Sequence, residues 1–268
     1  MSKQIVDKKP SDNEEYRQWL NSKLNVSITT ATKTRYESVM SKVKNDLCDS
    51  PFWSNFRDVL RKASEKYLAG TGYQLLQTND PVEISIKPFD SLVDKSFRRN
   101  VIENKNWPDP PDGNWVVPEN WLSRMNDLIR CCVVVKYMDG VECLITEINQ
   151  MCALHSISCQ SAYEARIEGY YAAHMYVKQN FEIPRVNWDT EKMPFKFEIQ
   201  ITTQLQEVIR KMTHTYYEKR RSRVKPEDRK WQWDWRSDEF TPYYLGHILH
   251  YVEGMILEVR DKQKDVLS

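Results

Sequence analysis

Glycine is scarce in this chain, and its scarcity limits the nucleotide-binding folds that the chain can adopt. Only seven of the 268 residues are glycine, and none of them form the patterns GxGxxG or GxxxxGKS. A Rossmann dinucleotide fold and a P-loop NTPase both depend on those glycines, which let the backbone approach the phosphates. If the protein handles nucleotides, we therefore expect another kind of phosphate site.

The hydrophobic and cysteine patterns predict a cytoplasmic protein. No run approaches the 18 apolar residues of a transmembrane helix. The first residues, MSKQIVDKKPSDNEEY, lack the apolar core of a secretion signal. Six cysteines form no CxxC pair and no zinc-spaced set. We therefore expect reduced cysteines, with Cys131, Cys132 and Cys143 in the core.

Helical periodicity marks both ends of the chain, and β-favouring runs lie between them. Helices are expected at 13–24, 31–47, 53–68, 87–104 (after a turn), 141–152, 203–220 and about 240–264. Strands are expected at 73–77, 129–137, 171–177 and 195–201. The stretch 107–120 contains four prolines and must be a loop. This order predicts an α/β (α+β) fold, a small mixed sheet flanked by helical extensions.

Two acidic residues stand out because of their places in the expected sheet. Asp127 precedes the buried strand 129–137, and Glu198 lies in the middle of strand 195–201, where a carboxylate is unfavourable. That strand alternates an apolar face with a polar face that carries Glu198 and Gln200. Two acids on neighbouring strands can share a divalent metal. The same pattern fits two solvated edge residues, and periodicity alone does not pair the two positions.

A basic cluster begins the predicted helix at 87–104. It contains Lys87, Lys95, Arg98 and Arg99. Residues 95 and 99 are i,i+4 neighbours, so the helix concentrates positive charge on one face. Such a face can hold a polyphosphate, and it can equally be a solvated basic surface.

The segment GYYAAH is a second candidate binding element. Gly169 precedes two tyrosines at the start of a strand, which can expose an aromatic face for stacking on a base. The alternative is a turn followed by core aromatics, with His174 as a hydrogen-bonded core histidine.

A basic segment with tryptophans follows the long helix. Residues 210–230 include nine Lys or Arg and three Asp or Glu, and Trp231, Trp233 and Trp235 come next. Cations beside exposed aromatic rings suit the RNA backbone and unstacked bases. The alternative is a basic helix end with tryptophans docked on the core. We assign His247 and His250, which are i,i+3 neighbours, to packing or to an interface.

Four blocks occur in the order of the RelA/SpoT synthetase family, which the chain resembles over about residues 83–220. KPFDSLVDKSFRR resembles the ATP-binding block of that family, and NDLIRCCVVV resembles its Asp-Leu-x-Gly-x-Arg strand. RIEGYYAAH resembles its Gly-Tyr-Arg-x-x-His loop, and FEIQITTQLQEVIRKMTHTYYEK resembles its Glu-Ile-Gln-Ile-Arg-Thr strand with the helix that follows. The resemblance implies a nucleotidyltransferase-like fold and transfer of pyrophosphate from ATP to a ribose hydroxyl.

The resemblance also implies a role for each matching residue. Asp127 and Glu198 would hold Mg²⁺, and Glu198 could take the proton of the attacking 3′-hydroxyl. The residues implied to bind ATP are Lys87, Ser91, Lys95, Arg98 and Arg99. Tyr170 would stack on the acceptor base. The other residues implied to line the acceptor pocket are Arg166, His174, Gln200 and His214.

Five positions depart from the family pattern. They are Ser85, Arg130, Cys132, Tyr171 and Thr202. Four of them stand where the family has an arginine, and Arg130 stands where it has a glycine. Three of the lost arginines lie on motifs that the housekeeping alarmone synthetases carry, so we favour an acceptor other than GDP or GTP. GYYAAH and the tail EFTPYYLGHILHYVEGMI are most similar to the toxic small alarmone synthetases of toxin–antitoxin systems.

The likeness to these toxins implies the 3′ CCA end of tRNA as the favoured acceptor and a cognate antitoxin as a partner. A free guanine or adenine nucleotide is the alternative acceptor, and an inactive binding module is a third hypothesis. The expected tRNA contacts are Lys219, Arg220, Arg221 and Arg223. We divide the chain into an N-terminal helical extension (1–70), a synthetase domain (71–220) and a C-terminal part (221–268).

Overall fold

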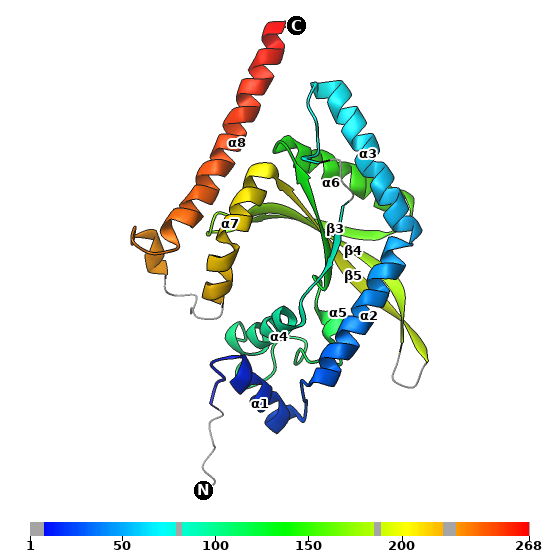
Figure 1. Ribbon diagram of the computed structural model, residues 1–268, viewed down its shortest axis with the longest axis vertical. Coiled ribbons are helices and arrows are strands. Elements are labelled where there is room, and N and C mark those ends of the chain that lie inside the picture. Colours follow the sequence, from blue (N-terminus) through cyan, green and yellow to red (C-terminus); the bar gives the residue numbers. More distant parts are fainter. Residues whose placement is uncertain (1–7, 79–81, 185–188, 222–228, 268) are drawn as a thin grey trace.

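The computed structural model describes residues 8–78, 82–184, 189–221 and 229–267, with side chains outside 214–230 and 264–267 (Figure 1). A five-stranded sheet in the order β1-β2-β5-β4-β3 forms its centre. The strands are β1 (Ile84–Ile86), β2 (Ile129–Val135), β3 (Ser158–Ala165), β4 (Tyr171–Pro184) and β5 (Thr190–Thr203). Only β2 and β5 pair in parallel; the other neighbours are antiparallel. The predicted mixed sheet is therefore confirmed.

Helices cover both faces of this sheet. They are α1 (Asn13–Leu24), α2 (Thr30–Cys48), α3 (Pro51–Thr71), α4 (Phe89–Phe97), α5 (Trp121–Arg124), α6 (Asp139–Leu154), α7 (Gln204–Arg221) and α8 (Phe240–Leu267). A π-helical turn (Arg98–Ile102) continues α4, and a 3-10 turn (Arg229–Gln232) precedes α8. In Figure 1, α2, α3 and α6 lie on one side of the sheet, and α7 and α8 lie on the other.

The observed helices begin and end close to the predicted bounds because residues that cap helices stand at these positions in the sequence. Asp12 accepts hydrogen bonds from the first turn of α1, and Ser50 with Pro51 begins α3. Gly72 ends α3 in a left-handed conformation with φ of 78°.

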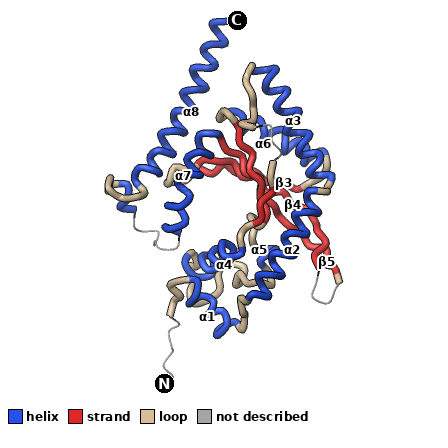
Figure 2. The backbone as a smooth tube through the Cα atoms, viewed as in Figure 1, coloured by secondary structure: helices blue, strands red, loops and turns tan. Residues whose placement is uncertain are grey.

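The strand predictions need correction. The expected strand at 73–77 is an isolated bridge from Leu76 to Val135, while the neighbouring β1 extends that edge of the sheet. The short β1 and the exposed edge strand β3 carry no continuous apolar run, so they were not predicted. Strands β4 and β5 are twice as long as expected because they pair with each other over the whole hairpin (Figure 2).

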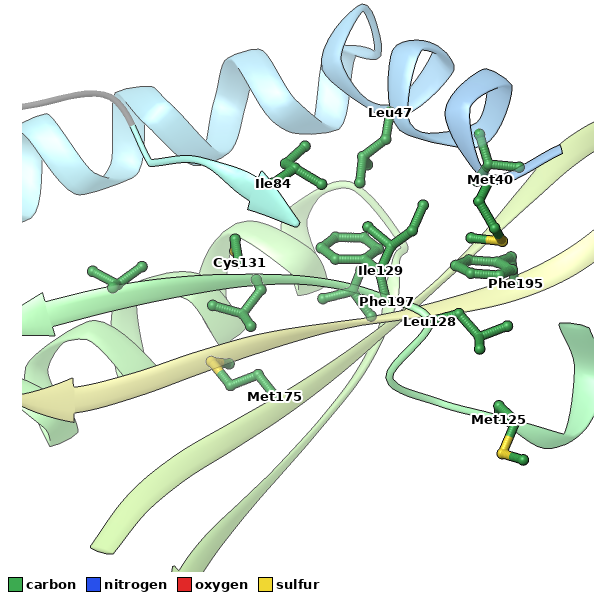
Figure 3. Packing of buried hydrophobic residues seen from close by; sticks show 14 of the residues in the cluster. Met40, Leu47, Ile84, Met125, Leu128, Ile129, Cys131, Met175, Phe195 and Phe197 are labelled. Atoms are coloured by element: carbon green, nitrogen blue, oxygen red, sulfur yellow. The ribbon is translucent and has the colours of Figure 1, made fainter. Parts of the chain in front are cut away.

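One hydrophobic cluster joins the N-terminal helices to the sheet. The alternating side chains of β5, Phe195, Phe197, Ile199 and Ile201, are at most 1% exposed. Figure 3 shows Met40 and Leu47 of α2 pointing toward the side of the sheet that carries Phe195 and Phe197. Helix α1 joins the same cluster through Tyr16, so α1, α2 and α3 all pack as part of the core.

Buried hydrogen bonds fix the helical elements that later form the site. Asn100, fully buried in the π-helical turn, donates to the hydroxyl of Tyr16 (2.7 Å) and accepts from the amide of Val116 (2.9 Å). It thereby ties α1 and the loop 107–120 to the turn that carries Arg98 and Arg99.

Helix α8 is anchored at two points. Arg260 donates to Tyr67 of α3 (2.7 Å) and to Asp139 of α6 (2.5 Å). Near its start, Gly246 lies against Gly169, where a Cβ on Gly246 would come within 2.9 Å of the Gly169 carbonyl carbon. Gly169 has a φ of 76°, so glycine is favoured there by conformation and by space.

The state of the cysteines, their burial and the polarity of the helices all bear on the expectations from the sequence. All six cysteines are free. Cys131 is buried as expected, but Cys132 and Cys143 are only partly buried, because they point away from the core face of β2 and α6. Among the described residues, none of the helices has the length and apolarity needed to cross a membrane.

Candidate active site

A cavity of about 480 Å³ opens on the α7 side of the sheet. It lies between α4 with its π-helical turn, the strands β2, β5 and β4, and the first half of α7. Asp127 and Glu198, which come from sequence blocks 71 residues apart, both line it. The structure therefore brings the two predicted acids to one cavity.

Four of the five residues predicted to bind ATP line this cavity: Lys87, Lys95, Arg98 and Arg99. Lys95 lies 2.8 Å from one carboxylate oxygen of Asp127, and Lys87 donates to the other over 3.1 Å. Arg99 donates to the backbone carbonyl of Arg124 (2.7 Å), which fixes its guanidinium at the cavity wall.

Burial and charge act in opposite directions on the Asp127 carboxyl. Burial alone would raise its pKa, but the nearby charges of Lys95 and Lys87 outweigh burial and hold the pKa well below its usual range. Burial lowers the pKa of Lys95, and the attraction of Asp127 offsets part of that change. Asp127 therefore stays ionised at neutral pH.

This balance predicts an effect of Lys95→Met on the acid stability of the protein. Folding lowers the pKa of Asp127, so its contribution to stability is present above the ordinary pKa of 3.8 and is lost as the pH falls through the lower folded pKa. Without Lys95 only Lys87 opposes burial, and the pKa rises. We expect the free energy of unfolding of the variant to depend less steeply on pH between about 2 and 5, by at most about 1.4 kcal/mol per pH unit.

Denaturant unfolding across that pH range measures the effect. The matched control is Lys136→Met, because Lys136 donates to the amide oxygen of Gln74 and to no carboxylate among the described contacts. Equal slopes for wild type and Lys95→Met would refute this view of Asp127.

Glu198 is not a solvated strand residue. It is 3% exposed on the central strand β5, and His174 Nδ1 lies 2.8 Å from one of its oxygens while Gln200 Nε2 donates to the other over 3.0 Å. His174 is 5% exposed, lies on β4 opposite Gln200 and reaches Glu198 from there. The prediction of a hydrogen-bonded, buried histidine is thus confirmed, and this histidine also lines the cavity.

Tyr170, which also lines the cavity, extends this chain of contacts. Its hydroxyl lies 2.9 Å from His174 Nε2. Because a carboxylate only accepts, Nδ1 carries the proton toward Glu198, and in a neutral imidazole Nε2 accepts from the tyrosine. Burial raises the pKa of Tyr170 to about 12, so its hydroxyl keeps its proton. The guanidinium of Arg166 lies over the ring, 5.2 Å from its centroid.

Sequence reasoning missed two arginines of the cavity. Arg130 pairs in register with Glu198, so it projects on the same face of the sheet. Arg210 lies in the second turn of α7, where Glu207 accepts hydrogen bonds from its guanidinium (2.7 and 2.8 Å). The alternation of strand 129–137 was the available signal for Arg130. Among the described residues, seven Lys or Arg and four Asp or Glu line the cavity.

Several predicted residues are not placed at the cavity. Ser91 lies in α4 but is absent from the described lining. His214, Lys219, Arg220 and Arg221 fall within the bounds of α7, and their side chains lie outside the described ones. Arg223 lies outside the described residues altogether.

The tryptophans divide into a buried one and two exposed ones. Trp231 is 5% exposed and packs edge-on against Tyr243, as the core-docking alternative predicts. Trp233 is 91% exposed, and Trp235 is 65% exposed beside the guanidinium of Arg236. The two histidines of α8 take part in packing as predicted: His247 bonds the hydroxyl of Tyr171, and His250 stacks on that ring.

The two carboxylates of Asp127 and Glu198 would hold Mg²⁺ only if the phosphates of a nucleotide supplied further ligands. Among the described residues there is no group of three or more His, Cys, Asp or Glu able to hold a metal alone. Mg²⁺ typically takes one or two carboxylates and completes its shell with water and substrate phosphates. Asp127 and Glu198 supply two such carboxylates to one cavity, and a metal would share Asp127 with its two lysines.

Solved structures of other proteins are similar to this fold. Small alarmone synthetase 1 from Bacillus subtilis, bound to its product pppGpp, matches with a TM-score of 0.52 at 15% identity, covering 85% of this chain and 94% of that one. The protein smu.1046c from Streptococcus mutans UA159 matches with a TM-score of 0.51 at 15% identity, covering 87% and 96%. The chain has the small alarmone synthetase fold. No protein-family model and no curated protein matches its sequence.

Proposed function

We propose that the protein is a pyrophosphokinase that transfers the β- and γ-phosphates of ATP, as pyrophosphate, to a ribose 3′-hydroxyl. One observation carries this proposal: Asp127 and Glu198 face a single cavity whose lining also holds seven cationic side chains. Phosphoryl transfer needs positioning and charge neutralisation more than a covalent protein group. The shared fold with a synthetase that binds pppGpp supports the same reaction class.

The cationic wall is suited to the donor. Lys87 directly follows β1, Lys95 lies in α4, and Arg98 and Arg99 lie in the π-helical turn. In this proposal these four side chains bind the phosphates of ATP. Mg²⁺ held by Asp127 and Glu198 would neutralise phosphate charge and align the donor. Charge-assisted hydrogen bonds from arginine add directional binding of phosphate oxygens.

The acidic and aromatic residues are suited to the acceptor. In the reaction the 3′-oxygen attacks the β-phosphorus, and the bond from that phosphorus to the bridging oxygen of the α-phosphate breaks, which releases AMP. Glu198 accepts the proton of the hydroxyl. His174 and Gln200 orient this carboxylate, and Tyr170, backed by Arg166, stacks on the acceptor base.

We favour the CCA end of tRNA as the acceptor. The basic range 210–230 begins within helix α7, and its first residue, Arg210, lines the cavity. Phosphates of an acceptor stem bind basic side chains largely without regard to sequence, and the exposed rings of Trp233 and Trp235 suit unstacked bases. On this proposal Lys219, Arg220, Arg221 and Arg223 contact tRNA, and binding weakens steeply with salt.

A labelled-transfer assay tests the reaction and the acceptor together. The protein is incubated with ATP labelled at the γ-phosphate, deacylated tRNA, GDP, GTP and adenine nucleotides. We expect label in the tRNA. Label in a free nucleotide instead would support the alternative, a small alarmone synthetase. If no acceptor is labelled, the enzyme proposal fails and the inactive binding module stands.

We further propose that the protein acts as the toxin of a toxin–antitoxin pair and inhibits translation in the cytoplasm. A toxin of this kind needs a cognate antitoxin protein. A stripe of exposed apolar side chains on α8 supports a docking surface there: Ile248, Tyr251, Met255 and Val259. Their spacing places them on one face of the helix, and soluble monomers rarely expose such stripes.

A further inference from the structure

A second cavity, of about 540 Å³, lies beside the candidate active site. It is an open cavity bordered by the start of α6, the paired strands β3 and β4, the end of β5 and the middle of α8. Its walls include the apolar side chains of Met138, Val141, Tyr163, Ala172 and Leu257. Gln206 is the one described residue that lines both cavities. The volume is within the range of small-molecule sites.

A buried carboxylate without a full set of partners faces this cavity. Glu253 of α8 is 5% exposed, and one of its oxygens accepts from the hydroxyl of Thr203. Its other oxygen is shielded from solvent and has no partner in good hydrogen-bond geometry, and the same holds for Nδ1 of His250. These two atoms lie 3.6 Å apart, too far for a hydrogen bond. The side chain of Gln206 lies near enough to act on the carboxyl, and it lowers the pKa of Glu253. Stacking on Tyr171, with ring centroids 3.7 Å apart, holds the imidazole in place.

The charged side chains that line the cavity favour a positively charged ligand. Four carboxylates line it, from Asp139, Glu142, Glu164 and Glu253, and none of its described lining residues is Lys or Arg. Asp139 is already paired with Arg260, and Glu164 is paired with Arg166. A phosphorylated or carboxylated ligand would meet only like charge, whereas a cation would satisfy the unpartnered oxygen of Glu253.

We propose that this cavity binds a small organic cation, an ammonium group on an apolar or aromatic body, with Glu253 as its anionic partner. The ammonium takes the free oxygen of Glu253, and the body contacts the apolar walls. Burial raises the pKa of the Glu253 carboxyl above its ordinary value, and a bound ammonium relieves the cost of keeping it ionised. The site is distinct from the proposed transfer reaction, because no step of that reaction uses it.

Calorimetric titration of the full-length protein tests the proposal with two probes of the same body. Phenethylamine carries the ammonium, and 2-phenylethanol carries a neutral hydroxyl in its place. We expect phenethylamine to bind about tenfold or more tightly than 2-phenylethanol, since hydrogen bonds to charged groups are stronger than neutral ones. Glu253→Gln should remove this preference. No binding of phenethylamine, or equal binding of both probes, would overturn the proposal.

Two further variants serve as controls for this titration. Glu142→Gln removes an exposed carboxylate of the same cavity, and we expect it to keep the preference within about twofold. Leu257→Trp fills the cavity and keeps Glu253, so it should lose both probes even if Glu253→Gln fails to fold. Retained binding in Leu257→Trp would place the ligand elsewhere and overturn the proposal. None of these titrations needs ATP, so their failure leaves the proposed transfer reaction untouched.

Discussion

Glu198→Gln is expected to lower pyrophosphate transfer by about 10²–10⁴-fold while the fold stays intact. The substitution keeps the shape of the side chain and removes its capacity to accept the proton of the attacking hydroxyl. His174 can still donate to the amide oxygen, and Gln200 can turn its own amide to match the new donor. Because the side chain is only 3% exposed, no bulk water replaces the lost base.

The assay is transfer of the γ-label from ATP, with circular dichroism and thermal unfolding as checks of the fold. Glu182→Gln is the matched control: Glu182 is an exposed residue of β4, pairs with Lys192 across the hairpin and lies outside the cavity lining. We expect it to transfer label as wild type does. Growth inhibition should follow activity, disappearing in Glu198→Gln. Full activity or full toxicity of Glu198→Gln would show that this carboxylate is not the base.

Most of what could be predicted about the site came from the alternation of apolar and polar residues in β5. Period-two hydrophobicity at 195–201 gave the strand, its buried face and the placement of Glu198 and Gln200 on the other face, and the structure confirms each. Periodicity could not show that β5 is the central strand. It therefore did not exclude a solvated Glu198, whose burial depends on pairing with both β2 and β4.

The partners of the acids were not predictable from spacing. His174 faces Gln200 in the register of β4 and β5 and reaches Glu198 from there, and a register is set by tertiary packing rather than by local sequence. Lys95 was predicted as one of four cations that bind ATP. Its ion pair with Asp127 joins two sequence blocks that only the fold brings together, so spacing could not predict it. Arg130 was known only as a departure from a family glycine, although the alternation of β2 places it beside Glu198.

Phe197→Ala is expected to destabilise the protein by about 3–5 kcal/mol. Phe197 is 1% exposed on the apolar face of β5, and its ring lies edge-on to Phe52 of α3 with centroids 5.1 Å apart. Truncation removes buried area and leaves a cavity between the sheet and the helix that cannot close fully. For a domain of this size each kcal/mol lowers Tm by roughly 2–4 °C, so a loss of about 10 °C is expected.

Urea unfolding at neutral pH measures this change, and Lys192→Ala on the exposed part of the same strand is the control, expected within about 0.5 kcal/mol of wild type. Phe197 and Glu198 are adjacent in sequence and point to opposite faces of β5. Their substitutions should therefore separate: Glu198→Gln loses transfer and keeps stability, and Phe197→Ala loses stability while its folded fraction, at low temperature, still transfers. A stable Phe197→Ala protein would contradict the packing of β5 against α3, and with it the rigid strand on which the proposed site depends.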